Sequence, residues 1–250
     1  MKKIAIQGIR GSFHDIAAHQ YFKGEELRLV CCDTFEDVFR QMRIDSACLG
    51  MVAIENTIAG SLLHNYELLR ESGMSIVGEH KLHVEHSLMC LPDDTAGAAE
   101  QIAREQLRGH AAVCHADAAG IYGLKVLARG IEDNKHNFTR FLVLADPWQA
   151  EAVRQQEEAD KSSIVFALPH EEGSLSQVLS IFSFYKINLT KIQSLPIIGH
   201  EWEYLFYVDV VYSDSLRFRQ SVDALRPLTR ALKILGEYKG SVSVKPDEQS

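Results

Sequence analysis

The sequence predicts an α/β protein made of two parts, and three observations support this prediction. The first 80 residues alternate short apolar runs with helical patterns, which is typical of a mainly parallel sheet covered by helices. Residues 162–250 carry strand and helix signals in the order βαββαβ, the ferredoxin-like arrangement. Residues 148–161, between the two parts, are polar and rich in charge, so they form either a linker or a solvated helix.

The elements of the first part follow from apolar runs and from capping residues. Ser12 and Thr34 can each cap a helix, and Asp37 follows Thr34 at the spacing of a capping box. Strands are predicted at residues 3–7, 27–30, 48–54, 74–78, 82–91 and 138–144. Helices are predicted at residues 12–21, 34–43, 61–71, 95–106 and 117–124. The strand at 48–54 is apolar enough to be buried on both faces of its sheet.

The elements of the second part follow from the period of its apolar residues. Four of them recur at helical spacing after Gly173, namely Leu175, Val178, Leu179 and Phe182. A long helix is predicted at residues 216–235, and Pro227 should kink it or begin a new segment because proline lacks a backbone N–H. Strands are predicted at residues 163–168, 187–198, 203–211 and 241–244.

Composition limits the class of protein and its partners. The 250 residues are 46% hydrophobic and 24% charged, as in a globular protein. Lys and Arg number 26 against 34 Asp and Glu, and the resulting charge of -8 argues against non-specific nucleic-acid binding. A site for a small anion must therefore be built locally.

The expected location is the cytoplasm. No apolar run in the sequence is long enough to span a bilayer, and the apolar stretch at the N-terminus is too short for a signal peptide. The five cysteines have an odd count and no CxxC spacing, which is typical of reduced thiols.

A hydroxyl and a guanidinium, those of Thr139 and Arg140, stand side by side at the start of a predicted buried strand. A neutral donor beside a fixed cation suits an anionic substrate that must lose a hydroxyl group. The triplet Thr139-Arg140-Phe141 by itself is more often ordinary strand edge. The triplet therefore indicates a binding site only when it is taken together with the residues around it.

Two loops that follow predicted strands have the composition of binding loops. Residues 8–12 place two glycines before a helix, and such a turn either presents N–H groups to an anion or is a simple turn with a Ser cap. It matches neither the Walker loop nor the GxGxxG fingerprint. Residues 55–61 follow the most buried strand, where open α/β sheets bind ligands. These residues include Asn56, Thr57, Gly60 and Ser61.

Three histidines, His80, His83 and His86, raise the question of a metal site. In a strand the first and the last share a face, and His83 points away. No carboxylate or Cys completes a set with metal-ligand spacing. We therefore expect no metal site.

Taken together, short motifs in a fixed order resemble the prephenate dehydratase family of phenylalanine biosynthesis. The matching pieces are residues 8–13, Ile54-Glu55-Asn56-Thr57 with Gly60-Ser61, His86-Ser87-Leu88-Met89, Tyr122-Gly123-Leu124 and Asn137-Phe138-Thr139-Arg140-Phe141. The C-terminal part resembles the ACT regulatory domain of that family at Gly173-Ser174-Leu175, Ile187-Asn188-Leu189-Thr190 and Leu235-Gly236-Glu237-Tyr238. The resemblance covers nearly the whole chain.

The resemblance implies a two-lobed, periplasmic-binding-protein-like catalytic domain in residues 1–147, a linker at 148–161 and an ACT domain in residues 162–250. It implies the decarboxylating dehydration of prephenate to phenylpyruvate, without metal or cofactor, under feedback by L-phenylalanine. The expected partners are these small molecules and further copies of the chain in a homodimer or homotetramer, with no nucleic acid and no membrane.

The resemblance also implies roles for single residues. Catalytic roles fall to Thr139, Asn56 and Glu100, and Thr139 would donate a hydrogen bond or a proton to the leaving hydroxyl. Substrate binding falls to Ser12, Thr57, Gly60, Ser61, Arg140 and Phe141. Arg140 would either pair with a carboxylate or brace its strand. Phenylalanine would bind at an interface between two ACT domains, at Gly173, Ser174, Leu175, Asn188, Leu189 and Ser194.

The chain departs from the family pattern at two places. Gln193-Ser194-Leu195-Pro196 stands where the family has Glu-Ser-Arg-Pro, and the two lost charges affect the expected phenylalanine site. Between Pro92 and Thr95 the family has roughly one further βα unit of its second lobe, with a Ser-His-Pro motif. Either the chain lacks this unit, or the unit exists outside the continuous numbering.

Three alternative functions stay open. The chain could act on arogenate, the amino-acid counterpart of prephenate, and no single residue decides between these two substrates. Without the extra unit the cleft would be open to water, which favours an inactive phenylalanine-binding sensor. A periplasmic-type binding protein is disfavoured by the missing signal peptide.

Overall fold

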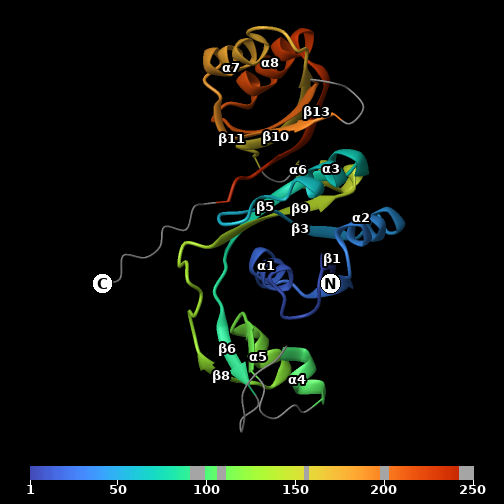
Figure 1. Cartoon of the computed structure of the whole chain (residues 1–250). Coiled ribbons are helices and arrows are strands. Elements are labelled where there is room, and N and C mark those ends of the chain that lie inside the picture. The colour runs from blue at the N-terminus through green and yellow to red at the C-terminus, as the bar shows by residue number, and fades with distance from the viewer. Residues whose placement is uncertain (91–98, 106–110, 155–157, 198–202, 242–250) are drawn as a thin grey trace. The chain divides into compact units, whose positions relative to one another are not determined.

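The computed structural model describes residues 1–90, 99–105, 111–154, 158–197 and 203–241 (Figure 1). The chain divides into two compact units, each of mixed α/β structure as predicted. Unit 1 contains residues 1–66 and 80–143, and unit 2 contains residues 67–79 and 144–250. Among the described residues, no helix has the length and the apolar character needed to cross a membrane.

The larger sheet has the strand order β2-β1-β3-β9-β5, and a short strand, β4, pairs with β3. These strands are β1 (Lys2–Gln7), β2 (Leu27–Cys32), β3 (Leu49–Asn56), β4 (Gly60–Ser61), β5 (Ser75–His83) and β9 (Phe138–Ala145). Strand β1 runs parallel to both β2 and β3. Residues 50–54 of β3 are buried, as expected for an apolar run at the centre of a parallel sheet.

Three helices follow the strands of this sheet: α1 (Phe13–Tyr21), α2 (Phe35–Ile44) and α3 (Leu63–Ser72). Both predicted caps are confirmed, because Ser12 Oγ accepts from Asp15 N and Thr34 Oγ1 accepts from Asp37 N. The predicted start of the third helix is wrong. Ser61 lies in β4 because its backbone pairs with Glu55, so the helix begins at Leu63.

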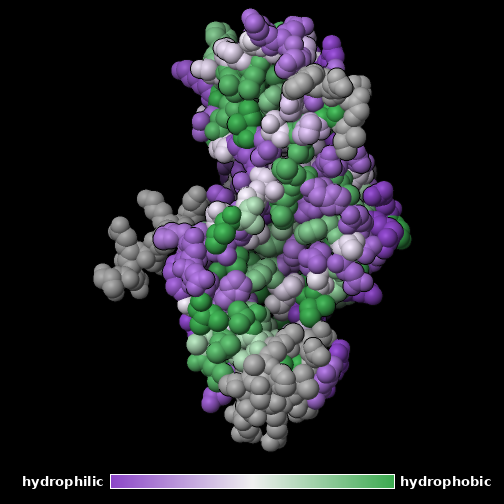
Figure 2. Space-filling view, in the orientation of Figure 1, coloured by the Kyte–Doolittle hydropathy of each residue, from purple (hydrophilic) through white to green (hydrophobic). Residues whose placement is uncertain are grey.

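A smaller antiparallel sheet of unit 1 has the order β7-β6-β8 and packs with two short helices. Its elements are β6 (Ser87–Cys90), α4 (Ala99–Glu105), β7 (Ala111–Cys114), α5 (Asp117–Tyr122) and β8 (Lys125–Ala128). The two strands β7 and β8 are absent from the sequence prediction. Each has only four residues, which is too few for an alternation of apolar and polar residues to be recognised. Apolar side chains gather over this lobe (Figure 2), where Ile121 and Leu127 are exposed.

Unit 2 contains a four-stranded antiparallel sheet of order β11-β12-β10-β13. Its elements are β10 (Lys161–Leu168), α7 (Ser174–Phe184), β11 (Asn188–Pro196), β12 (Tyr204–Val211), α8 (Ser215–Leu225), the 3₁₀ turn η1 (Arg226–Leu228) and β13 (Arg230–Tyr238). Residues of both helices, such as Phe182 and Phe218, share a buried core with Phe166 and Val208 of the sheet. The predicted βαββαβ order is confirmed.

The boundary of the last helix was predicted wrongly. Helix α8 ends at Leu225, and residues 230–238 form β13 rather than the second half of a long helix. Pro227 stops the helix because it has no N–H to donate. The apolar residues after it pack against the sheet core, with Leu232 and Ile234 alternating in the strand. The predicted final strand at 241–244 extends beyond the described residues.

The polar stretch after β9 begins with helix α6 (Pro147–Arg154), on which Trp148 is 83% exposed, so this part of the stretch is a solvated helix. Residues 67–79 belong to unit 2 through a buried ion pair in which Lys161 Nζ lies 2.7 Å from Glu79 Oε2. Gly236 lies against Ile76, whose carbonyl oxygen would collide with any added Cβ. A glycine is therefore required at position 236.

Candidate functional site

Residues at the end of β3 and at the start of β9 meet around the side chain of Asn56. Its amide nitrogen donates to Asn137 Oδ1 at 2.7 Å and to Thr139 Oγ1 at 3.0 Å, and Phe138 O lies 3.2 Å away. These residues are more than 80 positions from Asn56 in the sequence, so only the sheet brings them together. Two of the three predicted catalytic residues are thus in direct contact.

The orientation of the Asn56 amide is fixed by its oxygen. Asn56 Oδ1 accepts from the backbone nitrogens of Ile58 and Ala59, each at 2.9 Å. Backbone N–H groups can only donate, so the oxygen must face them and the NH₂ group must face Thr139. Thr139 Oγ1 is therefore the acceptor in this pair, and its own hydrogen is left to donate.

Thr57 holds the same two strand ends together and was predicted to bind substrate. Its hydroxyl donates to His136 O and accepts from Phe138 N, both at 2.9 Å. A hydroxyl has one hydrogen, so none remains for a substrate carboxylate. The Thr57 hydroxyl joins the loop after β3 to the start of β9, and its contact with substrate stays a prediction.

Arg140 and Phe141 follow Thr139 in β9, and both side chains are buried. Arg140 Nη1 lies 4.0 Å from Glu55 Oε2 at the end of β3. The Phe141 ring is 1% exposed and meets the ring of His14 edge-on at 4.9 Å. The side chain of Phe141 thus belongs to the core, and its contact with substrate stays a prediction.

The turn at residues 8–12 was expected to offer backbone N–H groups to an anion. Gly11 N donates instead to the Asp15 carboxylate at 2.6 Å, Gly8 N donates to Cys32 O, and Ser12 N donates to Ile9 O. A carboxylate of the chain itself therefore occupies the place of the expected anion at Gly11. The Ser12 hydroxyl accepts from Asp15 N and keeps a hydrogen for another partner.

The remaining predicted residues of the catalytic part have different outcomes. Gly60 has a φ of +80°, a left-handed conformation that favours glycine, and its backbone pairs with Asn56. Ser61 pairs with Glu55 in the same short ladder, so both residues shape the loop around Asn56. Glu100 lies in α4, but its side chain is outside the described residues.

A cavity of about 300 Å³ lies between the 8–12 turn and the small lobe. Its lining includes Arg10, Gly11 and Ser12 of the turn, together with Cys114, Ala118 and Tyr122 of the lobe. The Tyr122 hydroxyl donates to Arg10 O, and Gly11 approaches Ala118 closely enough that an added Cβ would lie 3.2 Å from the Ala118 Cβ. The volume suits a small organic acid. Sequence reasoning found both the turn and Tyr122 but not their contact.

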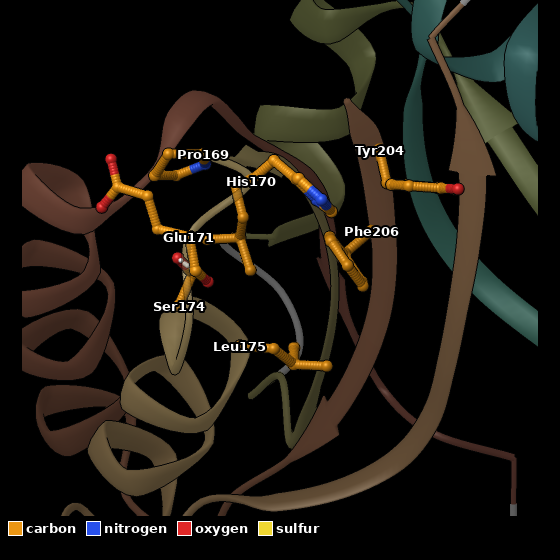
Figure 3. A pocket seen from close by; sticks show the side chains of 8 residues that line it. Pro169, His170, Glu171, Ser174, Leu175, Tyr204 and Phe206 are labelled. Carbon is orange, nitrogen blue, oxygen red and sulfur yellow. Dashed lines mark hydrogen bonds between the residues drawn. The ribbon is translucent and has the colours of Figure 1, made fainter. Parts of the chain in front are cut away.

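A second pocket, of about 160 Å³, lies in unit 2 where α7 begins (Figure 3). Its lining residues are Leu168, Pro169, His170, Glu171, Ser174, Leu175, Tyr204 and Phe206. Gly173 has a φ of +82° and is the N-cap of α7, which explains why glycine opens the helix. Two predicted effector-binding residues, Ser174 and Leu175, thus line this pocket.

The other predicted effector residues lie elsewhere on β11. Ser194 pairs with Phe206 near the pocket, whereas Asn188 and Leu189 pair with Val211 and Val210 at the opposite end of β12. A single chain therefore does not bring Asn188 and Leu189 to the pocket beside Leu175.

The three histidines considered for a metal site have separate partners. His80 Nε2 contacts Gln20 Oε1 at 3.0 Å, and His83 Nε2 contacts Lys135 O at 2.8 Å. The backbone nitrogen of His86 donates to Glu132 Oε2. Among the described residues, no group of three His, Cys, Asp or Glu side chains could hold a metal ion.

A hydroxyl donor oriented by an amide at the edge of an α/β sheet is suited to assist a departing hydroxyl group, and this chemistry is that of a carbon–oxygen lyase. Comparison with known proteins agrees with this class. The prephenate dehydratase profile matches residues 4–94 and 92–148, more than half of the 250 residues. The chain belongs to the prephenate dehydratase family, whose dehydration reaction serves phenylalanine biosynthesis.

Several known proteins are similar to this chain. Arogenate dehydratase 1 of Petunia hybrida is 34% identical over 288 aligned positions, which cover 94% of this chain and 66% of that protein. The chain thus spans about two thirds of that relative's length.

Solved structures share the fold. The structure titled GqqA, a novel type of quorum quenching acylases, has a TM-score of 0.82 at 26% identity and covers 96% of this chain and 98% of that one. Prephenate dehydratase from Arthrobacter aurescens, solved in complex with L-Phe, has a TM-score of 0.77 at 24% identity. The match covers 95% of this chain and 90% of that one.

The comparison also bears on the segment expected between Pro92 and Thr95, which lies outside the described residues. The 288 aligned positions hold only about 235 residues of this chain, 94% of its 250, so about 53 positions are occupied in the Petunia relative alone. The family match divides at residues 92–94, the predicted junction. The extra unit is therefore absent from this sequence.

Proposed function

We propose that this chain converts prephenate to phenylpyruvate and that Thr139 assists the departure of the ring hydroxyl. The observation that carries the proposal is the 3.0 Å hydrogen bond from Asn56 Nδ2 to Thr139 Oγ1. Because this bond occupies an acceptor position of Oγ1, the hydroxyl hydrogen is directed to another partner. Asn56 would orient Thr139, and Thr139 would touch the substrate.

The reaction needs little from the protein beyond binding and one donor. The bond between the ring and its carboxylate breaks to release CO₂, and its electron pair enters the ring. The C–O bond para to it breaks at the same time, and the departing hydroxide takes up a proton and leaves as water. The ring becomes aromatic, which supplies the driving force. A positioned donor typically contributes about 10²- to 10⁴-fold to such a step.

The substrate carboxylates would be held near the 8–12 turn. Ser12 has a hydroxyl hydrogen to donate and lines the cavity of about 300 Å³ beside the small lobe. Arg140 would brace β9, because its side chain is 8% exposed and faces Glu55. Arg140 would thus stabilise the strand that carries Thr139, and the carboxylates would be bound by groups of the cavity such as Ser12 and Arg10.

L-Phenylalanine would bind at the pocket beside Ser174 and Leu175 and lower turnover. Prephenate dehydratase from Arthrobacter aurescens was solved in complex with L-Phe, which supports phenylalanine as the ligand. In this proposal residues 1–147 are catalytic, 148–161 connect, and 162–250 are an ACT regulatory domain. Asn188 and Leu189 would reach the pocket from a second copy of the chain.

Arogenate is the second candidate substrate, because the similar Petunia protein is named for it. The experiment is turnover of prephenate and of arogenate by the purified protein, with and without L-phenylalanine. We expect phenylpyruvate from prephenate, at a rate that phenylalanine lowers. A higher kcat/KM for arogenate would reassign the substrate. A folded protein that binds phenylalanine but turns over neither would be a sensor.

A further inference from the structure

The side chain of His14 is buried near the site, and no step of the proposed reaction uses it. It lies in the first turn of α1, is 8% exposed, and packs between the rings of Phe35 and Phe141 at 5.5 and 4.9 Å. An imidazole in such surroundings must find a partner for its polar atoms, because an unbonded buried polar group is costly. The identity of that partner shows what His14 does.

The partner is the backbone of β3. His14 Nε2 accepts a hydrogen bond from Ala53 N at 3.3 Å. The carbonyl oxygen of the same residue accepts from Asn65 Nδ2 at 2.7 Å, and Asn65 is 2% exposed. Two buried side chains, one from α1 and one from α3, therefore hold both backbone groups of Ala53.

These bonds are made beyond the pairing of β1 with β3, in the part of β3 that leads to Asn56. The pairing of β1 with β3 ends at Met51, two residues before Ala53. Buried backbone groups beyond that point still require partners. Asn56 lies three residues farther along. Between them Ile54 O accepts from Leu62 N and Glu55 pairs with Ser61, so the bonds of His14 and Asn65 to Ala53 are among several that fix the end of β3.

The hydrogen bond also fixes the protonation state of His14. A backbone N–H can only donate, so Nε2 must carry a lone pair and the ring must be neutral with its hydrogen on Nδ1. Burial lowers the pKa of His14 to about 4, which agrees with a neutral ring. His14 therefore serves as an acceptor and not as an acid.

We propose that His14 and Asn65 are positioning residues that fix the end of β3 and thereby hold Asn56 against Thr139. The inference rests on the proposed function, because it concerns the residue that orients the proposed donor. It predicts that loss of the His14 acceptor moves Asn56 although His14 touches no substrate. A displacement of about 1 Å at such a site typically lowers the rate on the order of 100-fold.

The test compares His14→Leu, which keeps an apolar side chain without an acceptor, with His14→Gln, whose amide oxygen can accept from Ala53 N. We expect kcat to fall on the order of 100-fold in His14→Leu and to recover most of that loss in His14→Gln. KM should change little, since the substrate contacts remain. His64→Gln is the matched control, because His64 is exposed and pairs with Glu36 at the surface.

A second readout separates this inference from the proposed function. The side-chain NH₂ resonances of Asn56 report its hydrogen bonds whether or not the protein turns over prephenate. They should shift in His14→Leu and stay near their wild-type positions in His14→Gln and His64→Gln. If the wild-type protein is inactive on both substrates, the proposed function is wrong. The positions of the Asn56 resonances then still test whether His14 positions Asn56.

Two outcomes would overturn the inference. One is a His14→Leu protein with wild-type kcat and unshifted Asn56 resonances. The other is a His14→Gln protein as impaired as His14→Leu, which would show that the acceptor is irrelevant. Should His14→Leu fail to fold, Asn65→Ala removes the other bond to Ala53 and must shift the same resonances; unshifted resonances there would also overturn it.

Discussion

The site around Asn56 and the pocket beside Leu175 differ in how much of each a single chain supplies. At Asn56, residues more than 80 positions apart meet within unit 1, and both amide atoms of the side chain have partners. At the pocket of unit 2, Ser174 and Leu175 line the space, while Asn188 and Leu189 lie at the far end of β11. One chain supplies every described contact of Asn56, whereas it does not bring Asn188 and Leu189 to the pocket.

The physical reason lies in the two sheets. In unit 1 the loop after β3 turns back through β4 and is bonded to the start of β9, so its polar groups converge in one place. In unit 2 the antiparallel strand β11 carries predicted ligands near its two ends, and Asn188 and Ser194 are six residues apart. At about 3.4 Å per residue this spacing exceeds the reach of a small ligand.

The largest expected effect concerns the donor. Thr139→Ala should lower kcat for prephenate by about 10²- to 10⁴-fold, because the departing hydroxyl loses its donor. Thr139→Ser keeps the hydroxyl that Asn56 orients and should restore most of the rate. Turnover of purified variants measures both. Full activity in Thr139→Ala would show that the reaction needs neither the Thr139 hydroxyl nor its hydrogen bond with Asn56.

The next effect concerns the ion pair that joins residues 67–79 to the ferredoxin-like sheet. Lys161→Met leaves Glu79, whose side chain is 1% exposed, without its cation, and should lower the free energy of unfolding by about 3–5 kcal/mol. The double variant Lys161→Met with Glu79→Gln removes the buried charge and should regain part of the loss. Urea unfolding curves measure these differences.

Lys239→Met is the matched control for this prediction. Lys239 pairs with Asp160 at 2.5 Å, but the two side chains are 56% and 40% exposed. Loss of such a surface pair typically costs about 0–1 kcal/mol. Equal destabilisation by both lysine variants would mean that burial of the Lys161–Glu79 pair does not raise the free energy lost when its lysine is removed.

A complementation experiment tests whether a second copy completes the pocket. Leu175→Trp should fill the pocket, and Asn188→Ala should remove a contact from the other subunit, so each should weaken phenylalanine inhibition by about tenfold, or 1.4 kcal/mol. Co-expressed as mixed dimers, the two variants restore one intact site and should recover inhibition in part. Unchanged inhibition in Asn188→Ala would instead make the pocket complete within one chain.

An effect smaller than that of the buried ion pair concerns His14 and pH. Burial lowers the pKa of His14 to about 4, whereas the unfolded chain titrates near 6.5. Below 6.5 the unfolded state takes up the proton and the folded state does not, so stability present at higher pH is lost as pH falls toward 4. Between pH 7 and pH 5 this contribution is about 2 kcal/mol.

Comparison with His14→Gln isolates this contribution, because glutamine does not titrate. The difference in unfolding free energy between pH 7 and pH 5 should be about 2 kcal/mol smaller in His14→Gln than in the wild type or in His64→Gln. The same pH dependence in all three proteins would mean that His14 takes up a proton without unfolding.

The sequence predicted most elements of both units because the relevant signals are local. Ser12 and Thr34 cap their helices through bonds that span three residues, and the apolar run of β3 marks a buried strand. The βαββαβ order also follows from local patterns. The helix predicted across Pro227 failed because Leu232 and Leu235 recur at helical spacing, while Leu232 and Ile234 also fit the period of a strand.

The candidate site was predicted only in part. The order of the motifs indicated Asn56 and Thr139 together as candidates. No local pattern shows that the Thr57 hydroxyl donates to His136 O or that Gly11 N donates to the Asp15 carboxylate. His14 carried no signal at all, since its role consists of one bond to Ala53 across 39 positions. Each of these assignments depends on which groups the fold brings within hydrogen-bond distance.

The sequence by itself determined the α/β class, the order of most strands and helices, and the residue types available for chemistry, because these follow from periodicity, caps and composition. The tertiary structure decided which of those residues still has a hydrogen to donate. A hydroxyl has only one, and its direction is set by neighbours far away in the chain, so Thr57 and Thr139 differ only after folding.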